Sequence, residues 1–170
     1  MVTLDRNNRI LVEQGLRRIR AGQCRPGLRA LLEIAVCRLD RLSARDLAFT
    51  AAPRLNAAGR RDDMGIGVEC LTTEDPVRAM QLARRLHALN AERREIEVSM
   101  REEAEVIATL VAASQSQPPS WLCLYGKDWH HGVIGIVAAR IRERRHRPVI
   151  AFADAGAGRL RGSARSIAGL

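Results

Sequence analysis

The sequence predicts an α/β protein made of a helical region, one long helix and a strand–helix–strand unit. Two observations predict it. The run from Pro76 to Ala113 contains no Gly and no further Pro, and its apolar residues recur every three or four positions, which is typical of one continuous helix. After the polar stretch at residues 114–120, the pattern changes to short apolar runs around a second helical segment, which indicates a parallel sheet.

The long helix has a clear start and an uneven apolar face. Asp75 suits the cap position and Pro76 the first helical position. Arg93 and Glu103 interrupt the apolar row, which argues against a two-stranded coiled coil. We therefore expect a strut that joins two compact parts; a surface helix of one all-helical domain is the alternative. The residues expected to face inward are Leu82, Leu86, Leu89, Ile96, Met100, Ile107 and Leu110.

Short helices are expected before the long helix. In the first of them, Ile10, Leu11 and Leu16 are the apolar residues expected to face inward. Arg25-Pro26-Gly27 breaks the pattern and separates this helix from the next. The expected helices cover residues 7–19, 28–35, 44–52 and 68–71.

The third of these helices has predicted start and stop signals. Ser43 and Asp46 have the spacing of a capping box, in which each residue binds the backbone N–H of the other. Pro53 is expected to end the helix, because proline has no N–H and clashes with the preceding turn. Residues 54–67 are rich in Gly, Asn and Asp, so they are expected to form an ordered loop or a broken helix.

The C-terminal part predicts a right-handed strand–helix–strand unit with parallel strands. Trp121–Tyr125 and Pro148–Phe152 are the two strands, and Arg159–Ser166 is a candidate third strand. Such a unit needs more strands to bury its faces, so the sheet is expected to continue beyond Leu170. The crossover helix is expected at residues 131–144, with an inward face of Val133, Ile134, Ile136, Val137 and Ile141.

Charge is distributed unevenly along the chain. The formal net charge is +9, and it divides into +4 over residues 1–78, −1 over residues 79–113 and +6 over residues 114–170. Two basic regions joined by a near-neutral helix indicate an anionic partner, most simply nucleic acid. An Arg-rich composition without a binding role is the alternative, since 27 of the 28 basic residues are Arg.

Several classes of protein are disfavoured by composition. The N-terminus lacks the apolar segment of a secretory signal, and no apolar run is long enough to cross a bilayer, so a cytoplasmic protein with no membrane partner is expected. The widely spaced cysteines form no Cys-x-x-Cys pair, which disfavours a zinc site and a disulfide framework. They are expected to be reduced and mostly buried: Cys24, Cys37, Cys70 and Cys123.

Three groups of residues are candidate contacts for an anion. Arg54, Asn56 and Arg60 flank small residues, and the planar guanidinium suits a phosphate group. His130 lies between the first strand and the crossover helix, where α/β sheets gather ligands. Ser163 and Arg165, two apart on an extended segment, share one face. The alternatives are solvated arginines at the end of a helix, a histidine without a ligand and an exposed polar edge strand.

No group of residues supplies a complete catalytic set. The sequence has no acidic metal-binding cluster of the Asp-x-Asp type, no defensible Ser/His/acid arrangement and no phosphate-loop motif. The acids between Glu92 and Glu105 are expected to form a solvated helix face with pairs such as Glu97–Arg101. The sequence therefore predicts anion-binding residues rather than a catalytic site.

With these motifs in view, the whole chain resembles the middle of the RecJ-type single-strand-specific exonucleases of the DHH phosphoesterase superfamily. The motifs occur in the order and with the spacing of that family. Two positions depart from it, since Thr3 stands in place of a Pro and Arg61 in place of an aliphatic residue. The motifs are Leu4-Asp5…Asn8-Arg9, Pro53 to Arg60, Ala91 to Arg94, Trp129-His130, Gly132 to Ile136, His146 to Ile150 and Gly162 to Ser166.

The resemblance implies the helical tail of a DHH catalytic domain at residues 1–78, a connecting helix at 79–113, a linker at 114–118 and the truncated start of an α/β DHH-associated domain at 119–170. In the full-length enzyme, manganese or magnesium would be bound by Asp-x-Asp-Gly and Asp-His-His motifs upstream of Met1, and a Gly-Gly-His motif would follow Leu170. This chain would then contain no catalytic residue and no metal ligand, and alone it would be inactive.

The resemblance also implies roles for individual residues. Arg54, Asn56 and Arg60 would lie near the phosphodiester of single-stranded DNA, and His130 would face it from the second domain. Ser163 and Arg165 would hold the 5′-phosphate and favour 5′→3′ exonuclease action in DNA repair and recombination. A single-strand-binding protein and a helicase are the implied protein partners.

Two other functions remain open from the sequence. One is a DHH-family phosphodiesterase that acts on short oligonucleotides or cyclic dinucleotides; a further nucleic-acid-binding domain downstream would argue against it. The other is a truncated, non-catalytic product that binds nucleic acid, for which salt-dependent binding to single strands without hydrolysis would be the evidence.

Overall fold

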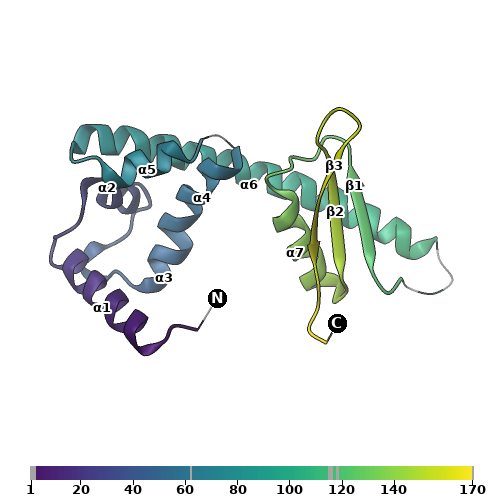
Figure 1. The fold of residues 1–170 in the computed structure, drawn as a ribbon, viewed down its shortest axis with the longest axis horizontal. Helices are drawn as coiled ribbons and strands as arrows, with labels where there is room; N and C mark the ends of the chain where they lie inside the picture. The colour runs from purple at the N-terminus through teal and green to yellow at the C-terminus, as the bar shows by residue number, and fades with distance from the viewer. Residues whose placement is uncertain (1–2, 62, 115–116, 118, 170) are drawn as a thin grey trace. The chain divides into compact units, whose positions relative to one another are not determined.

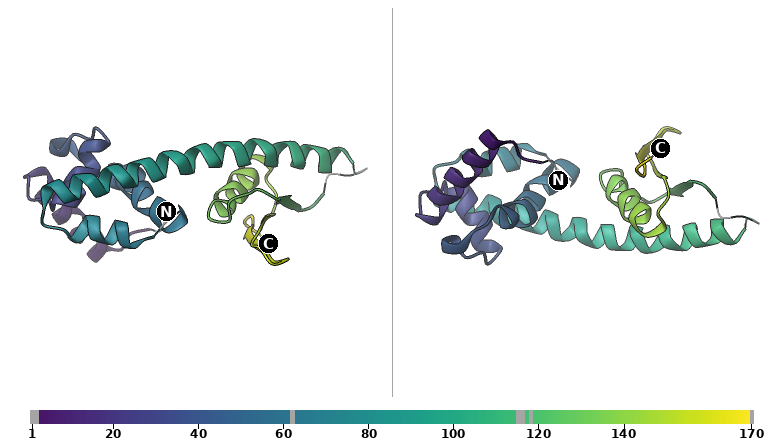
Figure 2. Two further views of the ribbon diagram at one scale, coloured as in Figure 1. Left: turned by 90° about the horizontal axis from the view of Figure 1, so that it is seen from above. Right: turned by 90° about the horizontal axis from the view of Figure 1, so that it is seen from below.

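The central element of the fold is α6 (Pro76–Ala113), a helix of 38 residues that is continuous from end to end (Figure 2). The prediction of one long helix is therefore confirmed. Asp75 caps it as expected, since the Val77 N–H donates to Asp75 Oδ1 at 2.9 Å. The computed structural model describes residues 3–61, 63–114, 117 and 119–169; three residues of the expected linker, 115, 116 and 118, lie outside this set.

The chain forms two compact units, residues 1–91 and 92–170. The first unit contains α1 (Arg6–Arg20), α2 (Pro26–Ile34), η1 (Leu39–Arg41), α3 (Ala44–Asp46), the π-helical turn η2 (Leu47–Ala51), α4 (Ala52–Arg61), α5 (Gly65–Thr72) and the start of α6 (Figure 1). The second contains the rest of α6, β1 (Leu122–Gly126), α7 (Ile134–Arg145), β2 (Val149–Asp154) and β3 (Leu160–Arg165). The α/β fold class is confirmed.

In the first unit, α6 packs by the predicted apolar row. Leu82, Leu86 and Leu89 are buried together with Ala79 and Ala83. The row follows the three-to-four spacing of one helix face, so the helix lies with this face against α2 and α5. Burying three leucines contributes about 1.5–3 kcal/mol each relative to exposure.

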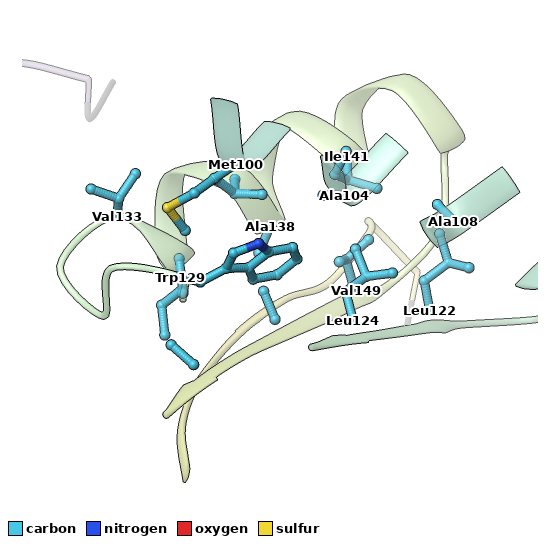
Figure 3. Packing of buried hydrophobic residues seen from close by; sticks show 14 residues of the cluster. Met100, Ala104, Ala108, Leu122, Leu124, Trp129, Val133, Ala138, Ile141 and Val149 are labelled. Atoms are coloured by element: carbon cyan, nitrogen blue, oxygen red, sulfur yellow. The ribbon is translucent and has the colours of Figure 1, made fainter. Parts of the chain in front are cut away.

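In the second unit, the predicted residues Ile96, Met100 and Ile107 pack against the core, and Ala104 and Ala108 complete the row. Met100, Ala104 and Ala108 are buried at a spacing of four (Figure 3). Ile96 and Ile107 are partly buried and pack against the same cluster. The prediction for Leu110 is wrong, because its side chain is 65% exposed. Two residues correspond to roughly 200° around a helix, so Leu110 lies almost opposite Ala108.

The prediction of a solvated acidic face on α6 is wrong for Glu97 and Glu105, which are half-buried, and right for the exposed residues Glu92, Glu95, Glu102 and Glu103. Glu97 pairs with Arg93 at 2.6 Å rather than with Arg101. Glu105 accepts from Arg145 of α7 at 2.7 Å. These carboxylates are about one-sixth exposed, because α7 covers this side of α6. The two interruptions of the apolar row, Arg93 and Glu103, bind Glu97 of the same helix and Trp129 of the turn before α7.

The α1 helix packs by its C-terminal half. Leu16 and Ile19 are buried and Val12 packs beside them, whereas Ile10 and Leu11 are 51% and 70% exposed. The prediction is right for Leu16 and wrong for the other two. Positions 12, 16 and 19 form one face at the spacing of four and three, and residues 10 and 11 lie off that face.

The capping box at the start of α3 is confirmed. The Asp46 N–H donates to Ser43 Oγ at 3.3 Å, and the Ser43 N–H donates to Asp46 Oδ2 at 2.8 Å. The Ser43 hydroxyl also donates to Asp46 Oδ2 at 2.7 Å. These donors hold the pKa of the Asp46 carboxyl below its ordinary value of 3.8, because they stabilise the charged form.

Pro53 does not end the helix, so that prediction is wrong. The chain forms a π-helical turn at Leu47–Ala51 and then continues as α4 through Pro53. A π turn is wider than an α turn, and it lies directly before the residue whose ring would otherwise meet the carbonyl four positions earlier. Of the two alternatives for residues 54–67, the broken helix is confirmed, since α4 ends at Arg61 and α5 begins at Gly65.

The second unit contains a three-stranded mixed sheet in the order β1–β2–β3. β1 and β2 are parallel, as predicted, with Leu124 opposite Ala151, and β3 is antiparallel to β2. One sheet face is buried against α6 and α7. Most of the predicted inward face of α7 is buried, although Ile136 is only partly covered. The buried sheet residues are Leu122, Leu124, Val149, Ala151 and Ala153.

The cysteines are free thiols, as predicted. Cys70 is buried, Cys24 and Cys37 are half-buried, and Cys123 is exposed because its position on β1 points away from the buried sheet face. Burial raises the pKa of the Cys24 and Cys70 thiols. In the described part of the chain, no helix is long and apolar enough to cross a membrane.

The two faces of α6 provide a test of its packing. Met100→Ala should lower the free energy of unfolding by about 2–5 kcal/mol, because it leaves a cavity in the second unit. Leu110→Ala on the same helix should change it by less than about 0.5 kcal/mol. Urea denaturation followed by circular dichroism measures both. Equal losses in the two variants would contradict the observed orientation of the helix.

The capping box predicts a pH dependence. Because the pKa of Asp46 is lower in the folded state, its stabilising contribution is present above the unfolded-state pKa and is lost as pH falls through the folded-state pKa. Ser43→Ala removes the largest cause, the hydroxyl donor, so the pKa of Asp46 should rise toward 3.8. A carboxyl titration by NMR measures this value; an unchanged pKa in the variant would argue against the hydrogen bond.

Candidate nucleic-acid interface

The first candidate group lies on α4, and the structure divides it. Arg54 is only 8% exposed. Its Nε donates to His87 Nδ1 at 3.2 Å and its Nη1 donates to the Thr50 carbonyl at 2.6 Å. The guanidinium therefore links α4, the π turn and α6 inside the first unit.

The other two residues of this group are at the surface. Asn56 and Arg60 are exposed and lie four positions apart, so they share one face of α4. An amide and a guanidinium on one helix face present several N–H donors to a phosphate oxygen. The π turn at Leu47–Ala51 sets the rotation of α4 and thus the direction of this face.

The second candidate, His130, lies in the turn between β1 and α7. The Gly132 N–H donates to His130 Nδ1 at 3.1 Å, so Nδ1 is an acceptor and carries no proton. In the neutral ring the proton is therefore on Nε2, which is a donor. The His131 ring stacks on the His130 ring at 5.0 Å, with 13° between their planes.

Trp129 fixes the position of this turn. Its side chain is only 4% exposed, and its Nε1–H donates to Glu103 Oε2 of α6 at 2.8 Å. The ring lies directly over Gly126, where a Cβ would be 2.1 Å from the indole nitrogen. The turn that carries His130 is thus held by a hydrogen bond on one side and by close packing on the other.

The third candidate group, Ser163 and Arg165, is brought together on β3 as predicted. Arg165 Nη1 donates to Ser163 Oγ at 3.1 Å and to the Ala164 carbonyl at 2.7 Å. Because Ser163 Oγ accepts this bond, its own hydroxyl proton points elsewhere and can be donated to an anion. We refer to these two residues as the Ser163–Arg165 pair.

The Ser163–Arg165 pair lies against the first turn of α7. A Cβ on Gly135 would be 2.9 Å from Arg165 Nη2 and 3.0 Å from Ser163 Oγ. A guanidinium, a hydroxyl and the bare backbone of a helix start therefore meet at one place. Charge-assisted hydrogen bonds from such donors suit a phosphate group.

Sequence reasoning missed three residues that shape these groups. Glu103 interrupts the apolar row of α6, and its carboxylate accepts the hydrogen bond of Trp129 although the residue is exposed. Gly135 stood near the start of a helical run, where an isolated Gly signals a close approach. Trp129 belongs to one of the family motifs, but its packing on Gly126 depends on the tertiary fold.

The described residues do not fit a metal centre. Among residues 3–61, 63–114, 117 and 119–169, no three His, Cys, Asp or Glu side chains lie close enough together to bind an ion. His130 and His131 stack on each other rather than converging on a common point. The three candidate groups are suited to binding an anion.

Comparisons with known proteins cover the whole chain. It is 57% identical over 170 residues to the single-stranded-DNA-specific exonuclease RecJ of Dickeya dadantii and 54% identical to that of Escherichia coli, in each case over 100% of this chain and 30% of the relative. The chain is therefore similar over its whole length to part of the RecJ exonucleases. Residues 118–170 match the DHHA1 domain.

Solved RecJ structures have the same fold. The crystal structure of exonuclease RecJ bound to manganese superimposes with a TM-score of 0.78 at 35% identity, over 96% of this chain and 38% of that one. The Thermus thermophilus RecJ structure in complex with Mg²⁺ gives 0.77 at 35% identity, over 96% and 24%. The chain thus spans about three-tenths of the length of the curated relatives it matches.

The burial of Arg54 predicts a structural effect. Arg54→Ala should lower the free energy of unfolding by about 1.5–3 kcal/mol, because it removes charge-assisted hydrogen bonds inside the first unit. Asn56→Ala, on the exposed face of the same helix, should change it by less than about 0.5 kcal/mol. Chemical denaturation measures both values, and an Arg54→Ala variant as stable as the wild type would contradict the structural role.

Proposed function

We propose that this chain is the substrate-binding middle of a 5′→3′ single-stranded-DNA exonuclease. The identity of 51–57% over its full length to four single-stranded-DNA-specific exonucleases supports the proposal most strongly. The Ser163–Arg165 pair supports it independently, because it joins a hydroxyl and a guanidinium on one strand face. These donors match the oxygens of a terminal phosphate.

The Ser163–Arg165 pair is proposed to bind the 5′-phosphate. A terminal phosphate carries a charge of about −1.5 to −2 at neutral pH, more than an internal phosphodiester, so a guanidinium favours it. His130 is proposed to donate from Nε2 to the same DNA strand. A preference for the chain end over an internal phosphate would favour exonuclease over endonuclease action.

The α4 group is proposed to contact the DNA backbone. Asn56 and Arg60 are exposed and can donate to phosphodiester oxygens without reading the sequence of bases. Arg54 is proposed to support them from beneath α4, since its guanidinium binds within the unit. Contacts of this kind release counterions, so binding should weaken as salt concentration rises.

The catalytic metal ions are proposed to belong to the full-length enzyme. RecJ structures are in complex with Mg²⁺ or Mn²⁺, whereas the described residues here do not fit an ion. We therefore expect the isolated chain not to hydrolyse DNA. A manganese-dependent nuclease assay on the purified chain tests this expectation: degradation above the level of a Ser163→Ala/Arg165→Ala variant would contradict it.

The cellular setting follows from the same proposal. We propose that the full-length protein acts in the cytoplasm in DNA repair and recombination, with a single-strand-binding protein and a helicase as partners. A helicase would supply the unwound strand that such an enzyme degrades. Cell fractionation and affinity purification of the full-length protein test these points; recovery with membranes would contradict the location.

The phosphate contact can be tested by binding. Arg165→Ala should weaken the binding of a 5′-phosphorylated oligothymidylate by about 10- to 100-fold, because a charge-assisted hydrogen bond is lost. Its effect on the 5′-hydroxyl oligomer should be small. Arg159→Ala removes the same charge just before β3, so it should weaken both oligomers equally. Fluorescence anisotropy measures all four affinities, and equal effects of the two variants would contradict the assignment.

A further inference from the structure

Gly135, the second residue of α7, has no backbone reason to be glycine. Its φ is not in the left-handed region, which among the described glycines is occupied by Gly22, Gly156, Gly158 and Gly169. Within a helix, glycine is less favourable than alanine. The reason for a glycine here must therefore be sought in the atoms around it.

Those atoms belong to the Ser163–Arg165 pair. A Cβ on Gly135 would lie 2.9 Å from Arg165 Nη2 and 3.0 Å from Ser163 Oγ, and both distances are shorter than ordinary van der Waals contact. The third atom nearby, Ser163 Cβ, would be at 3.7 Å, which is an ordinary contact. The space that a methyl group would need is occupied by the two polar ends themselves.

The crowding at Gly135 comes from side chains rather than from backbone. The three atoms nearest to its Cβ position all belong to the side chains of β3, and none belongs to the buried apolar cluster. Arg165 Nη2 is the far end of a flexible side chain, so a methyl group would displace the guanidinium rather than open the helix. A substitution at Gly135 is therefore expected to move the Ser163–Arg165 pair without lowering the stability of the fold.

We propose that Gly135 is a positioning residue for recognition of the 5′-phosphate. Its bare backbone lets the Arg165 guanidinium and the Ser163 hydroxyl lie directly on the first turn of α7. There, Nη1 of Arg165 is held by Ser163 Oγ and the Ala164 carbonyl while Nη2 faces Gly135. This inference rests on the proposed function of the pair.

The decisive variant is Gly135→Ala, measured in the chain of 170 residues with 5′-phosphorylated and 5′-hydroxyl oligothymidylates. It should retain helical content and a melting temperature at or above that of the wild type, because alanine favours the helix. Its preference for the 5′-phosphate should fall by about tenfold, which corresponds to the loss of one good hydrogen bond. Affinity for the 5′-hydroxyl oligomer should change by less than about twofold.

Gly15→Ala is the matched control. Gly15 also lies within a helix, α1, and a Cβ there would meet no atom within 4 Å. The same substitution should therefore raise helix stability and leave the phosphate preference unchanged. A double variant, Gly135→Ala/Arg165→Ala, should show no loss beyond that of Arg165→Ala, since the two changes act on the same contact.

The possible outcomes distinguish a failure of the inference about Gly135 from a failure of the proposed function of the Ser163–Arg165 pair. If the wild-type chain shows no preference for a 5′-phosphate, the proposed function of the pair is wrong and the inference fails with it. If the wild type shows the preference and Gly135→Ala keeps it, only the inference is wrong. If the Gly135→Ala chain does not fold, or if its affinities for both oligomers fall by the same factor, Gly135 has a structural role and the inference is wrong.

Discussion

The hydrogen bond between Trp129 Nε1 and Glu103 Oε2 is the contact on which the arrangement of the second unit depends. It joins the turn after β1 to α6, and the indole ring fills the space above Gly126. A buried indole N–H without an acceptor would be costly, so the acid on α6 is required by the tryptophan. With Trp129 fixed, the next residue, His130, and the start of α7 are fixed as well.

Arginines in this chain have two different roles, and the residues of the two groups differ in how far they are buried. Arg93 and Arg145 bind carboxylates of α6 and are largely covered, so they stabilise the second unit. Arg60 and Arg165 lie at exposed positions, where a phosphate can reach them. The net charge of +9 is therefore not a measure of the binding surface. In the proposed function, electrostatic attraction to DNA comes mainly from the second set.

Much of the fold could be predicted from local signals. The long helix followed from the absence of Gly and Pro and from Asp75, and the parallel strands followed from the change of period. The Ser163–Arg165 pair followed from the two-residue spacing of a strand. The wrong predictions for apolar residues concern contacts: Ile10, Leu11 and Leu110 are exposed because exposure depends on where neighbouring elements lie. The wrong prediction for Pro53 concerns the backbone, since the π turn before it lets the helix continue. The roles of Glu103 and Gly135 depend on contacts with Trp129 and β3, respectively. Because these partners are distant in the sequence, local patterns did not predict the roles.

The π-helical turn at Leu47–Ala51 makes the length of this segment as important as its composition. A π turn holds one more residue than the α turn it replaces, so a single-residue deletion there would restore a regular helix. The same deletion would rotate everything after it by about 100° and carry Asn56 and Arg60 to another side of α4. Related sequences that keep this surface should therefore tolerate exchanges within the turn but neither insertions nor deletions.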